Sequence, residues 1–118
     1  TAPRADAAPA SDAAPAEIRA KLAPRLARAR LIAIQAEDHY LRVHTEAGSD
    51  LILMRLADAL ATLKDRDGLQ VHRSWWVARC AVQTVQWKKG RGTLGLEGGL
   101  SVPVSETFAP TVRAMDWA

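Results

Sequence analysis

Short apolar runs separated by polar turns make up most of the chain. The runs Leu31–Ile34, Tyr40–Thr45 and Leu51–Met54 have the β-type composition of strands. Ala47–Asp50 has turn chemistry and lies between the second and third runs. We therefore predict a meander of three strands, with His44, in the middle of the second strand, at the surface.

The spacing of apolar residues becomes helical at Leu56. It stays helical as far as Leu63, with polar residues on the other side, and Asp65–Gly68 ends this two-turn helix. Strand patterns then resume in five runs: Leu69–His72, Trp75–Val77, Ala81–Trp87, Thr93–Leu96 and Leu100–Val104. Ser105 is placed to cap a last short helix. Strands joined by short turns predict a mainly β domain of small antiparallel sheets, with one or two short helices.

The start of the chain differs in composition from the rest. Residues 1–16 contain eight alanines and three prolines, with no aromatic or β-branched aliphatic side chain. Such a segment buries too little surface to offset the entropy of ordering it, so we predict a disordered Ala/Pro linker. Because the first residue is Thr1 and not Met, we expect a further region upstream in the full-length protein.

Residues 17–30 form a basic lead-in to the predicted strands. Ile18, Leu22 and Leu26 recur at four-residue spacing, which predicts a short helix that Pro24 kinks or breaks. Five basic residues of this segment, opposed only by Glu17, are Arg19, Lys21, Arg25, Arg28 and Arg30. We expect the folded core to begin at Leu31, so that the domain covers residues 31–118 and survives removal of the lead-in.

Positive charge is local within the predicted domain. The formal net charge of the chain is only +3, and residues 31–118 carry equal numbers of basic and acidic side chains. Between Gly68 and Leu96 there is no Asp or Glu, yet this window holds Arg73, Arg79, Lys88, Lys89 and Arg91. A one-sided basic patch on a near-neutral domain suits a sequence-selective binder of a polyanion, because it orients the ligand as well as attracting it.

The stretch Val71–Val77 combines a strand pattern with three polar residues at its centre. Unpaired polar groups inside a buried strand cost about 1–3 kcal/mol each, so we predict a tight bend or strand end that turns Arg73 outward. A guanidinium there suits phosphate oxygens or the guanine edge, and the alternative is a merely solvated arginine. We expect His72 to be a hydrogen-bonded structural residue. Trp75 and Trp76 must point to opposite faces, so at least one belongs to the core.

Several functional classes have no support in the sequence. The single cysteine, Cys80, excludes an internal disulfide and a cysteine-based metal cluster, and indicates a reducing cytoplasm. The spacing of Asp58, Asp65 and Asp67 fits no metal-binding loop. No Gly-rich phosphate loop, nucleophile elbow or plausible Cys/His pair is present. We predict no enzyme activity, no cofactor and no metal site, and no apolar run reaches the ~20 residues that span a bilayer.

The order and spacing of four motifs resemble the LytTR-type DNA-binding domain of bacterial transcription regulators. The motifs are Ile34–Tyr40, Leu56–Leu63, Val71–Val77 and Val102–Ser105, and the resemblance runs from about Leu31 to Val112. It implies an elongated arrangement of small β-sheets whose loop side chains, in place of a recognition helix, enter successive major grooves. The implied ligand is double-stranded DNA carrying short direct repeats in a promoter.

Carried over by position, the base-reading loops of this family fall at three places. The first is His39, which either reads a base or is simply a surface histidine beside two acidic residues. The second is Arg73 with Ser74, and Ser74 either donates to a phosphate or caps a turn. The third is Ser105, Glu106 and Thr107, where the family usually has a basic residue after the serine. Glu106 accepts from a cytosine amino group, makes no base contact, or lies favourably at a helix N-terminus.

A hairpin tip supplies the remaining candidates for contact with DNA. Lys88, Lys89 and Arg91 surround a glycine turn and suit contacts to the phosphate backbone, which position a domain without specifying sequence. The alternative is an ordinary solvated turn.

The resemblance also implies partners beyond the domain. These are an upstream receiver or transmembrane sensor region and a dimer on DNA. The basic lead-in favours anionic lipid and hence inner-membrane anchoring of an otherwise cytoplasmic protein, or else it reinforces DNA binding. The rival function is a small β interaction module that binds a peptide through exposed tryptophans and a sheet edge.

Overall fold

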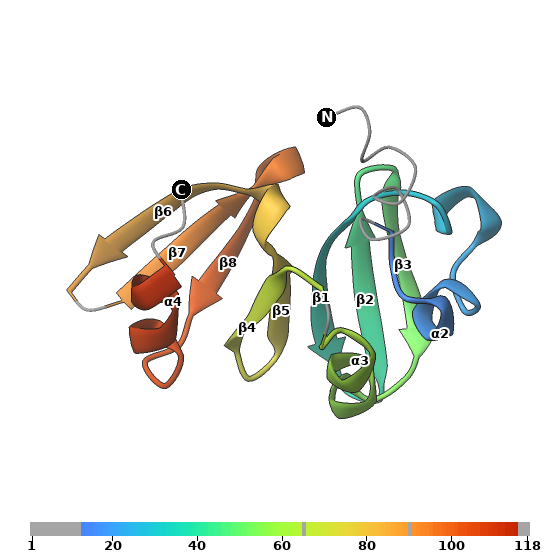
Figure 1. Cartoon of the computed structure of the whole chain (residues 1–118), viewed down its shortest axis with the longest axis horizontal. Coiled ribbons are helices and arrows are strands. Elements are labelled where there is room, and N and C mark those ends of the chain that lie inside the picture. The colour runs from blue at the N-terminus through green and yellow to red at the C-terminus, as the bar shows by residue number, and fades with distance from the viewer. Residues whose placement is uncertain (1–12, 65, 90, 116–118) are drawn as a thin grey trace.

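A computed structural model of the chain contains two antiparallel sheets side by side (Figure 1), and it describes residues 13–64, 66–89 and 91–115. The first sheet has the order β3-β2-β1-β5-β4 and the second the order β6-β7-β8. The strands are β1 Leu31–Glu37, β2 Tyr40–Thr45, β3 Gly48–Leu53, β4 Gly68–His72, β5 Trp75–Ala78, β6 Val82–Lys88, β7 Arg91–Leu96 and β8 Leu100–Val104. The predicted mainly β fold of small antiparallel sheets is confirmed.

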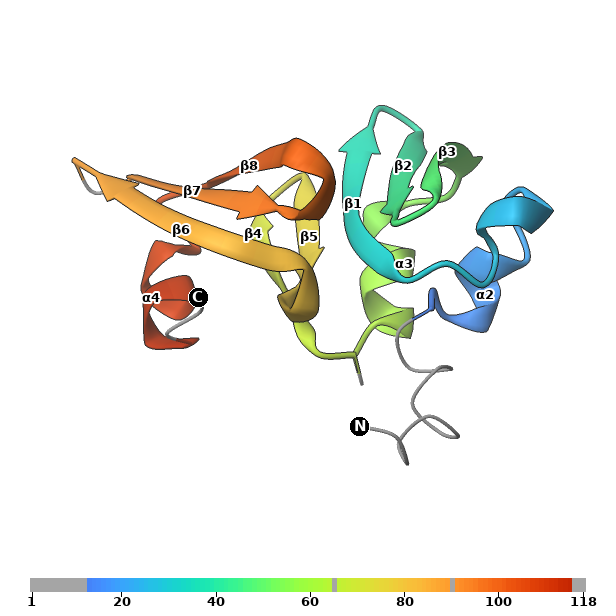
Figure 2. The same cartoon turned by 90° about the horizontal axis from the view of Figure 1, so that it is seen from above.

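Short helices connect and cover these sheets. They are α2 Ala16–Arg19, α3 Leu56–Thr62 and α4 Ala109–Met115, with 3-10 turns η1 Pro24–Leu26, η2 Arg79–Ala81 and η3 Glu97–Gly99. Figure 2 shows α3 and α4 on the same side of the molecule, α3 against the first sheet and α4 against the second. The predicted helix from Leu56 is confirmed. Its buried Ala59, with Leu63 just beyond its end, joins the hydrophobic core.

Strand alternation places the core between the sheets and these helices. In β2, Leu41, Val43 and Thr45 are buried while the residues between them are partly exposed. All four residues of β5 are buried because this strand lies between β1 and β4 and both of its faces are covered. Trp75 and Trp76 therefore both belong to the core, at 8% and 3% exposure.

The basic lead-in is part of the folded domain. Instead of one helix over residues 17–30, the structure has α2 and η1, and Pro24 begins the second of these because proline fits the first turn of a helix. Ile18, Leu22 and Leu26 are buried in the core cluster. The expectation that the core begins at Leu31 is therefore wrong. The predicted linker, residues 1–16, lies mostly outside the described residues.

The environment of His44 also differs from expectation. The ring is half-buried and stacks on Trp75 with centroids 5.8 Å apart, and its Nε2 is buried without a hydrogen-bond partner among the described residues. Burial and the nearby Arg42 guanidinium lower the pKa of His44. This mid-strand histidine is a packed residue and not the predicted surface one, because β2 lies inside the sheet and β1 places Trp75 within reach.

Candidate nucleic-acid interface

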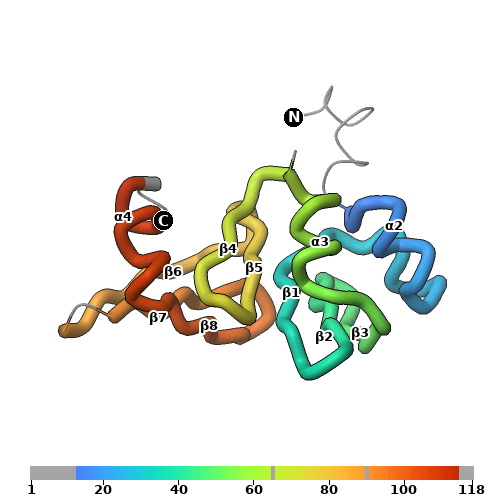
Figure 3. The backbone as a smooth tube through the Cα atoms, turned by 90° about the horizontal axis from the view of Figure 1, so that it is seen from below, coloured from blue at the N-terminus to red at the C-terminus, as the bar shows by residue number. Residues whose placement is uncertain are grey.

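Three connections between strands lie along one edge of the molecule, and we call them the turn edge. They are residues 38–39 between β1 and β2, 73–74 between β4 and β5, and 105–107 between β8 and α4. Figure 1 has these connections along its lower edge, and Figure 3 views the molecule from that side. The three predicted base-reading segments therefore come together at one edge.

Backbone hydrogen bonds keep the turn edge in register. The N–H of Ala36, near the end of β1, donates to the carbonyl of Ser74 at 2.8 Å. The N–H of Ser105, just after β8, donates to the carbonyl of Val71 in β4 at 3.0 Å. The middle turn is thus bonded to the strand on each side of it, so all three turns are positioned by the sheets.

His39 lies in a two-residue turn between β1 and β2. Glu37 pairs with Tyr40 across the β1–β2 hairpin, and Asp38 has a φ of 55°, a left-handed conformation that aspartate tolerates. His39 is exposed, and of its two acidic neighbours Glu37 accepts a hydrogen bond from the Nε of Arg42 at 2.7 Å. The Arg42 guanidinium lowers the pKa of this carboxyl. The carboxylate thus stays ionised, but its charge is largely offset beside His39.

The Arg42–Glu37 ion pair was not predicted from the sequence. Arg42 pairs in register with Gln35, and its side chain reaches diagonally along the ladder to Glu37. Diagonal pairs of this kind are common in antiparallel sheets, but they follow only from the exact register. The hairpin signal alone did not supply that register.

Arg73 occupies the centre of the turn edge. The turn is closed by pairing of His72 with Trp75, and the Ser74 N–H donates to Nδ1 of His72 at 3.1 Å, so the predicted structural role of His72 is confirmed. The Arg73 side chain is exposed and makes no ion pair with any described residue. Ser74 is half-buried beside it. The hydrogen-bonded turn thus leaves the Arg73 side chain exposed to solvent.

The connection after β8 carries Ser105, Glu106 and Thr107. The carbonyl of Ser105 accepts the N–H groups of Phe108 at 3.0 Å and Ala109 at 2.9 Å, so Ser105 begins the turn that leads into α4 through its backbone. Its side chain is half-buried, whereas Glu106 and Thr107 are exposed. The exposed carboxylate of Glu106 faces the solvent at the outer end of the turn edge.

The predicted basic hairpin tip is present between β6 and β7. Lys88 pairs with Arg91, and Lys89 has a φ of 53°, while Gly90 lies outside the described residues. The three basic side chains are exposed. With Gln86, Thr93 and Glu106 they line an open hollow of about 590 Å³. Glu106 therefore belongs to the turn edge and also lines the hollow beside the basic hairpin tip.

Other basic residues are engaged within the protein. Arg30 forms ion pairs with Glu97 at 2.6 Å and Glu46 at 3.4 Å, and Arg79 pairs with Asp67 at 3.4 Å. In the lead-in, Arg19 and Arg25 donate to backbone carbonyls of residues 14 and 47. The lead-in is therefore a packed segment with several of its charges used internally, and its Arg30 is no free cation for DNA or lipid.

Comparison with known proteins identifies the family. A model of the LytTr DNA-binding domain matches residues 25–116. The chain belongs to this family. The matched span extends the predicted resemblance at both ends, into η1 and through α4. The matching model describes a DNA-binding domain, so family membership assigns DNA binding to this part of the protein.

Individual relatives agree with this assignment. The chain is 30% identical over 89 residues to the CO-responsive transcriptional regulator RcoM of Rhodospirillum rubrum, covering 74% of this chain and 38% of that protein. A solved LytTr DNA-binding domain from Bacillus cereus has the same fold, with a TM-score of 0.66 at 21% identity, over 72% of this chain and 79% of the solved one. The chain thus spans well under half of its curated relative.

The described part of the chain also bears on metals and membranes. Within residues 13–64, 66–89 and 91–115, no group of three or more His, Cys, Asp or Glu side chains could hold a metal ion. In the same part of the chain, every helix is too short or too polar to cross a bilayer. Asp65, one of the three aspartates whose spacing fits no metal-binding loop, lies outside the described residues.

Proposed function

We propose that this LytTr domain binds double-stranded DNA sequence-selectively, with side chains of the turn edge in successive stretches of major groove. In this proposal Arg73 contacts a base, and His39 and the segment 105–107 contact the DNA on either side of it. Lys88, Lys89 and Arg91 contact the phosphate backbone. Ser74 donates to a phosphate near Arg73. The domain would act as the output module of a bacterial transcription regulator.

The observation that carries this proposal is the position of Arg73. It is exposed, has no ion-pair partner among the described residues, and stands on a turn whose backbone is bonded to β1 through Ser74. An exposed arginine on a turn positioned in this way can donate two parallel hydrogen bonds to O6 and N7 of guanine, and each such pair discriminates by about 1–3 kcal/mol.

The test begins with selection of duplexes from a random pool, followed by fluorescence anisotropy with selected and scrambled duplexes. Arg73→Ala should lower affinity for the selected duplex and erase the preference at one base position. Arg79→Ala is the charge control, because it removes one exposed positive charge at the opposite end of β5, together with its ion pair to Asp67. Equal, sequence-independent losses in both variants would make Arg73 a general electrostatic contact. Absence of any selected sequence would sink the proposal.

A second candidate function is binding of a peptide at the free edge of the first sheet. Tyr40, Leu51 and Leu53 are exposed by 44%, 42% and 62% along β2 and the edge strand β3. The prediction that exposed tryptophans bind the peptide is wrong for Trp75 and Trp76, because both side chains are buried. Binding at this edge would be insensitive to salt, whereas DNA binding weakens steeply as salt rises. A salt titration of any captured partner therefore separates the two functions.

The context of the domain is a further part of this proposal. RcoM is named as a CO-responsive regulator, and this chain covers 38% of its length. We propose that the full-length protein likewise joins the LytTr domain to an upstream signal-sensing region, either a receiver or a membrane-attached sensor, and that two copies bind direct repeats. Sequencing of the complete gene tests the first point. The stoichiometry on a two-repeat duplex tests the second.

A further inference from the structure

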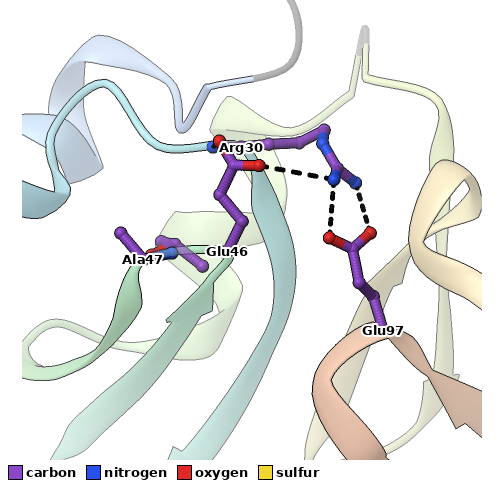
Figure 4. Close-up of polar contacts among 5 residues, drawn as sticks. Arg30, Glu46, Ala47 and Glu97 are labelled. Atoms are coloured by element: carbon purple, nitrogen blue, oxygen red, sulfur yellow. Dashed lines mark hydrogen bonds and ion pairs between the residues drawn. The ribbon is translucent and has the colours of Figure 1, made fainter.

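An ion pair joins the two sheets at the end remote from the turn edge (Figure 4). Arg30 Nη1 donates to Glu97 Oε1 at 2.7 Å, and Nη2 donates to Oε2 at 2.6 Å. This bidentate geometry is the strong form of an arginine–carboxylate contact. Each partner perturbs the other, raising the pKa of Arg30 and lowering that of Glu97. Both groups are therefore fully ionised at neutral pH.

The two partners precede the strands that lead to the outer turns. Arg30 comes immediately before β1, whose far end carries the turn with His39. Glu97 begins η3, which leads directly into β8, and the far end of β8 carries Glu106. The ion pair thus ties together the starts of two strands, and the outer parts of the turn edge lie at their ends.

Both partners are fixed in their own sheets. The N–H of Arg30 donates to Glu46 Oε2 at 3.3 Å, and its carbonyl accepts the Glu46 N–H at 3.0 Å. Leu96 pairs with Leu100 on either side of residues 97–99, so the second sheet closes the turn that carries Glu97. The backbone on each side therefore determines where the guanidinium and the carboxylate meet.

Side-chain packing does not fill the space between the sheets at this end. An open cavity of about 370 Å³ lies there, lined by Ile32, His44 and Ser49 from the first sheet and by residues 97–100 of the second. Glu97 lines this cavity and pairs with Arg30, and the two side chains are exposed by 31% and 26%. At the turn edge the Ser105–Val71 hydrogen bond joins the sheets directly, and near the ion pair the η2 turn that leads into β6 packs against β1.

We infer that Arg30 and Glu97 are positioning residues for DNA recognition, because their ion pair sets the angle between the two sheets and thereby the separation of His39 from Glu106. This inference rests on the proposed function. Rotation about the Ser105–Val71 contact would change the distance between the outer turns while leaving each turn intact. Selective binding requires that the turns meet the DNA simultaneously, so a loose angle lowers selectivity first.

Glu97→Gln tests this inference, with Glu46→Gln as the matched control. Both changes remove one negative charge beside Arg30, but Glu46 belongs to the same sheet as Arg30 and joins nothing across the gap. Residual dipolar couplings of the free protein report the relative orientation of the sheets. Affinities for the selected and scrambled duplexes report selectivity. Glu97→Asp keeps the charge and should restore much of the wild-type behaviour.

In Glu97→Gln we expect the relative orientation of the two sheets to change and the selected-to-scrambled affinity ratio to fall about fivefold, or ~1 kcal/mol. Glu46→Gln should keep both. Equal effects of the two variants, or an unchanged sheet orientation in Glu97→Gln, would overturn the inference. Arg30→Lys, which keeps the charge but loses the planar fork, serves if Glu97→Gln does not fold.

The two measurements separate this inference from the proposed function. If the domain had no sequence preference, Arg73→Ala and Glu97→Gln would leave the affinity ratio equally unaffected, whereas the dipolar couplings would still report the sheet angle. If the domain is selective but the ion pair does not set the angle, Arg73→Ala alone would lower the ratio.

Discussion

His44 stacks on Trp75 across the first sheet, with an angle of 16° between the ring planes. The contact joins the middle of β2 to the first residue of β5, which follows the turn carrying Arg73. His44 lies in a half-buried position next to Arg42, and both burial and that charge disfavour the imidazolium. Protonation of His44 therefore opposes the packing behind the central turn of the turn edge.

The free energy of unfolding should therefore decrease as the pH is lowered through the range in which histidine titrates. The pKa of His44 is lowered from 6.5 in the folded state, so below that value the unfolded chain binds the proton first and unfolding is favoured. Urea denaturation from about pH 8 to about pH 5 should show this fall. His44→Phe keeps an aromatic ring but removes the titration, and should flatten the profile. Identical profiles for the two proteins would contradict the prediction.

The acidic groups act in a separate pH window. Glu37 and Glu97 have pKa values lowered from 4.5 by their arginine partners, so their contributions to stability are lost only as the pH falls below that value. The fall assigned to His44 begins at a higher pH, near the unperturbed histidine value of 6.5. The two effects can therefore be distinguished in one titration.

The lead-in should contribute directly to stability. Leu26 is fully buried, at 0% exposure, in the core cluster. Leu26→Ala should lower the free energy of unfolding by about 2–5 kcal/mol, the usual cost of a cavity at a buried leucine. Leu53→Ala makes the same substitution at a side chain that is 62% exposed, and should cost about 0.5 kcal/mol or less. Equal stabilities in urea would show that the lead-in does not pack on the core in solution.

Features that depend on residues close together in the sequence were predicted correctly, whereas contacts between distant residues were not. Alternating apolar residues and turn chemistry located the strands to within a few residues, and the break at His72–Ser74 located the central turn. The contact between Arg30 and Glu97, by contrast, joins residues 67 positions apart in the sequence. No pattern in the sequence around either residue predicts it. It depends on the order of strands in two sheets, which no local pattern specifies.

The lead-in and His44 show the same limit at shorter range. Leu22 and Leu26 had the spacing of a helix face, but their burial depends on the surface that the β3 side of the sheet offers them. His44 had the alternation of an outward position, yet pairing of β1 with β5 places Trp75 against that face. Local pattern predicted the elements, and the packing partner decided which side chains were buried.

The hairpin tip should dominate non-specific binding to DNA. Lys88→Ala combined with Lys89→Ala should weaken binding to all duplexes alike and lower the slope of log affinity against log salt by about 0.9 for each phosphate that the hairpin no longer neutralises. Lys21→Ala combined with Arg28→Ala removes two exposed charges from the lead-in as a control. Equal changes of slope in both double variants would mean that the slope reports net charge and not binding by the hairpin.

Substitution of Glu106 tests the effect of an acidic residue at a position where the family usually has a basic one. Its carboxylate lines the same hollow as Lys88, Lys89 and Arg91 and lowers the positive potential there. Glu106→Arg should therefore raise affinity for selected and scrambled duplexes alike and steepen the salt dependence, by about 0.9 if the introduced guanidinium neutralises one phosphate. Glu17→Arg makes the same change of charge on α2 and should raise affinity less.

Glu106→Gln then separates repulsion from readout. The amide keeps the size of the side chain and removes its charge, so simple repulsion predicts a modest rise in affinity for every duplex. A carboxylate that accepts from a cytosine amino group would instead lose its preferred ligand, and the preference at one base position would fall by about 1–3 kcal/mol. We expect the uniform rise, because Glu106 lies beside three cations that already face the DNA backbone in this proposal. Loss of preference at a single position, measured over a set of single-base variants of the selected duplex, would assign Glu106 to base recognition.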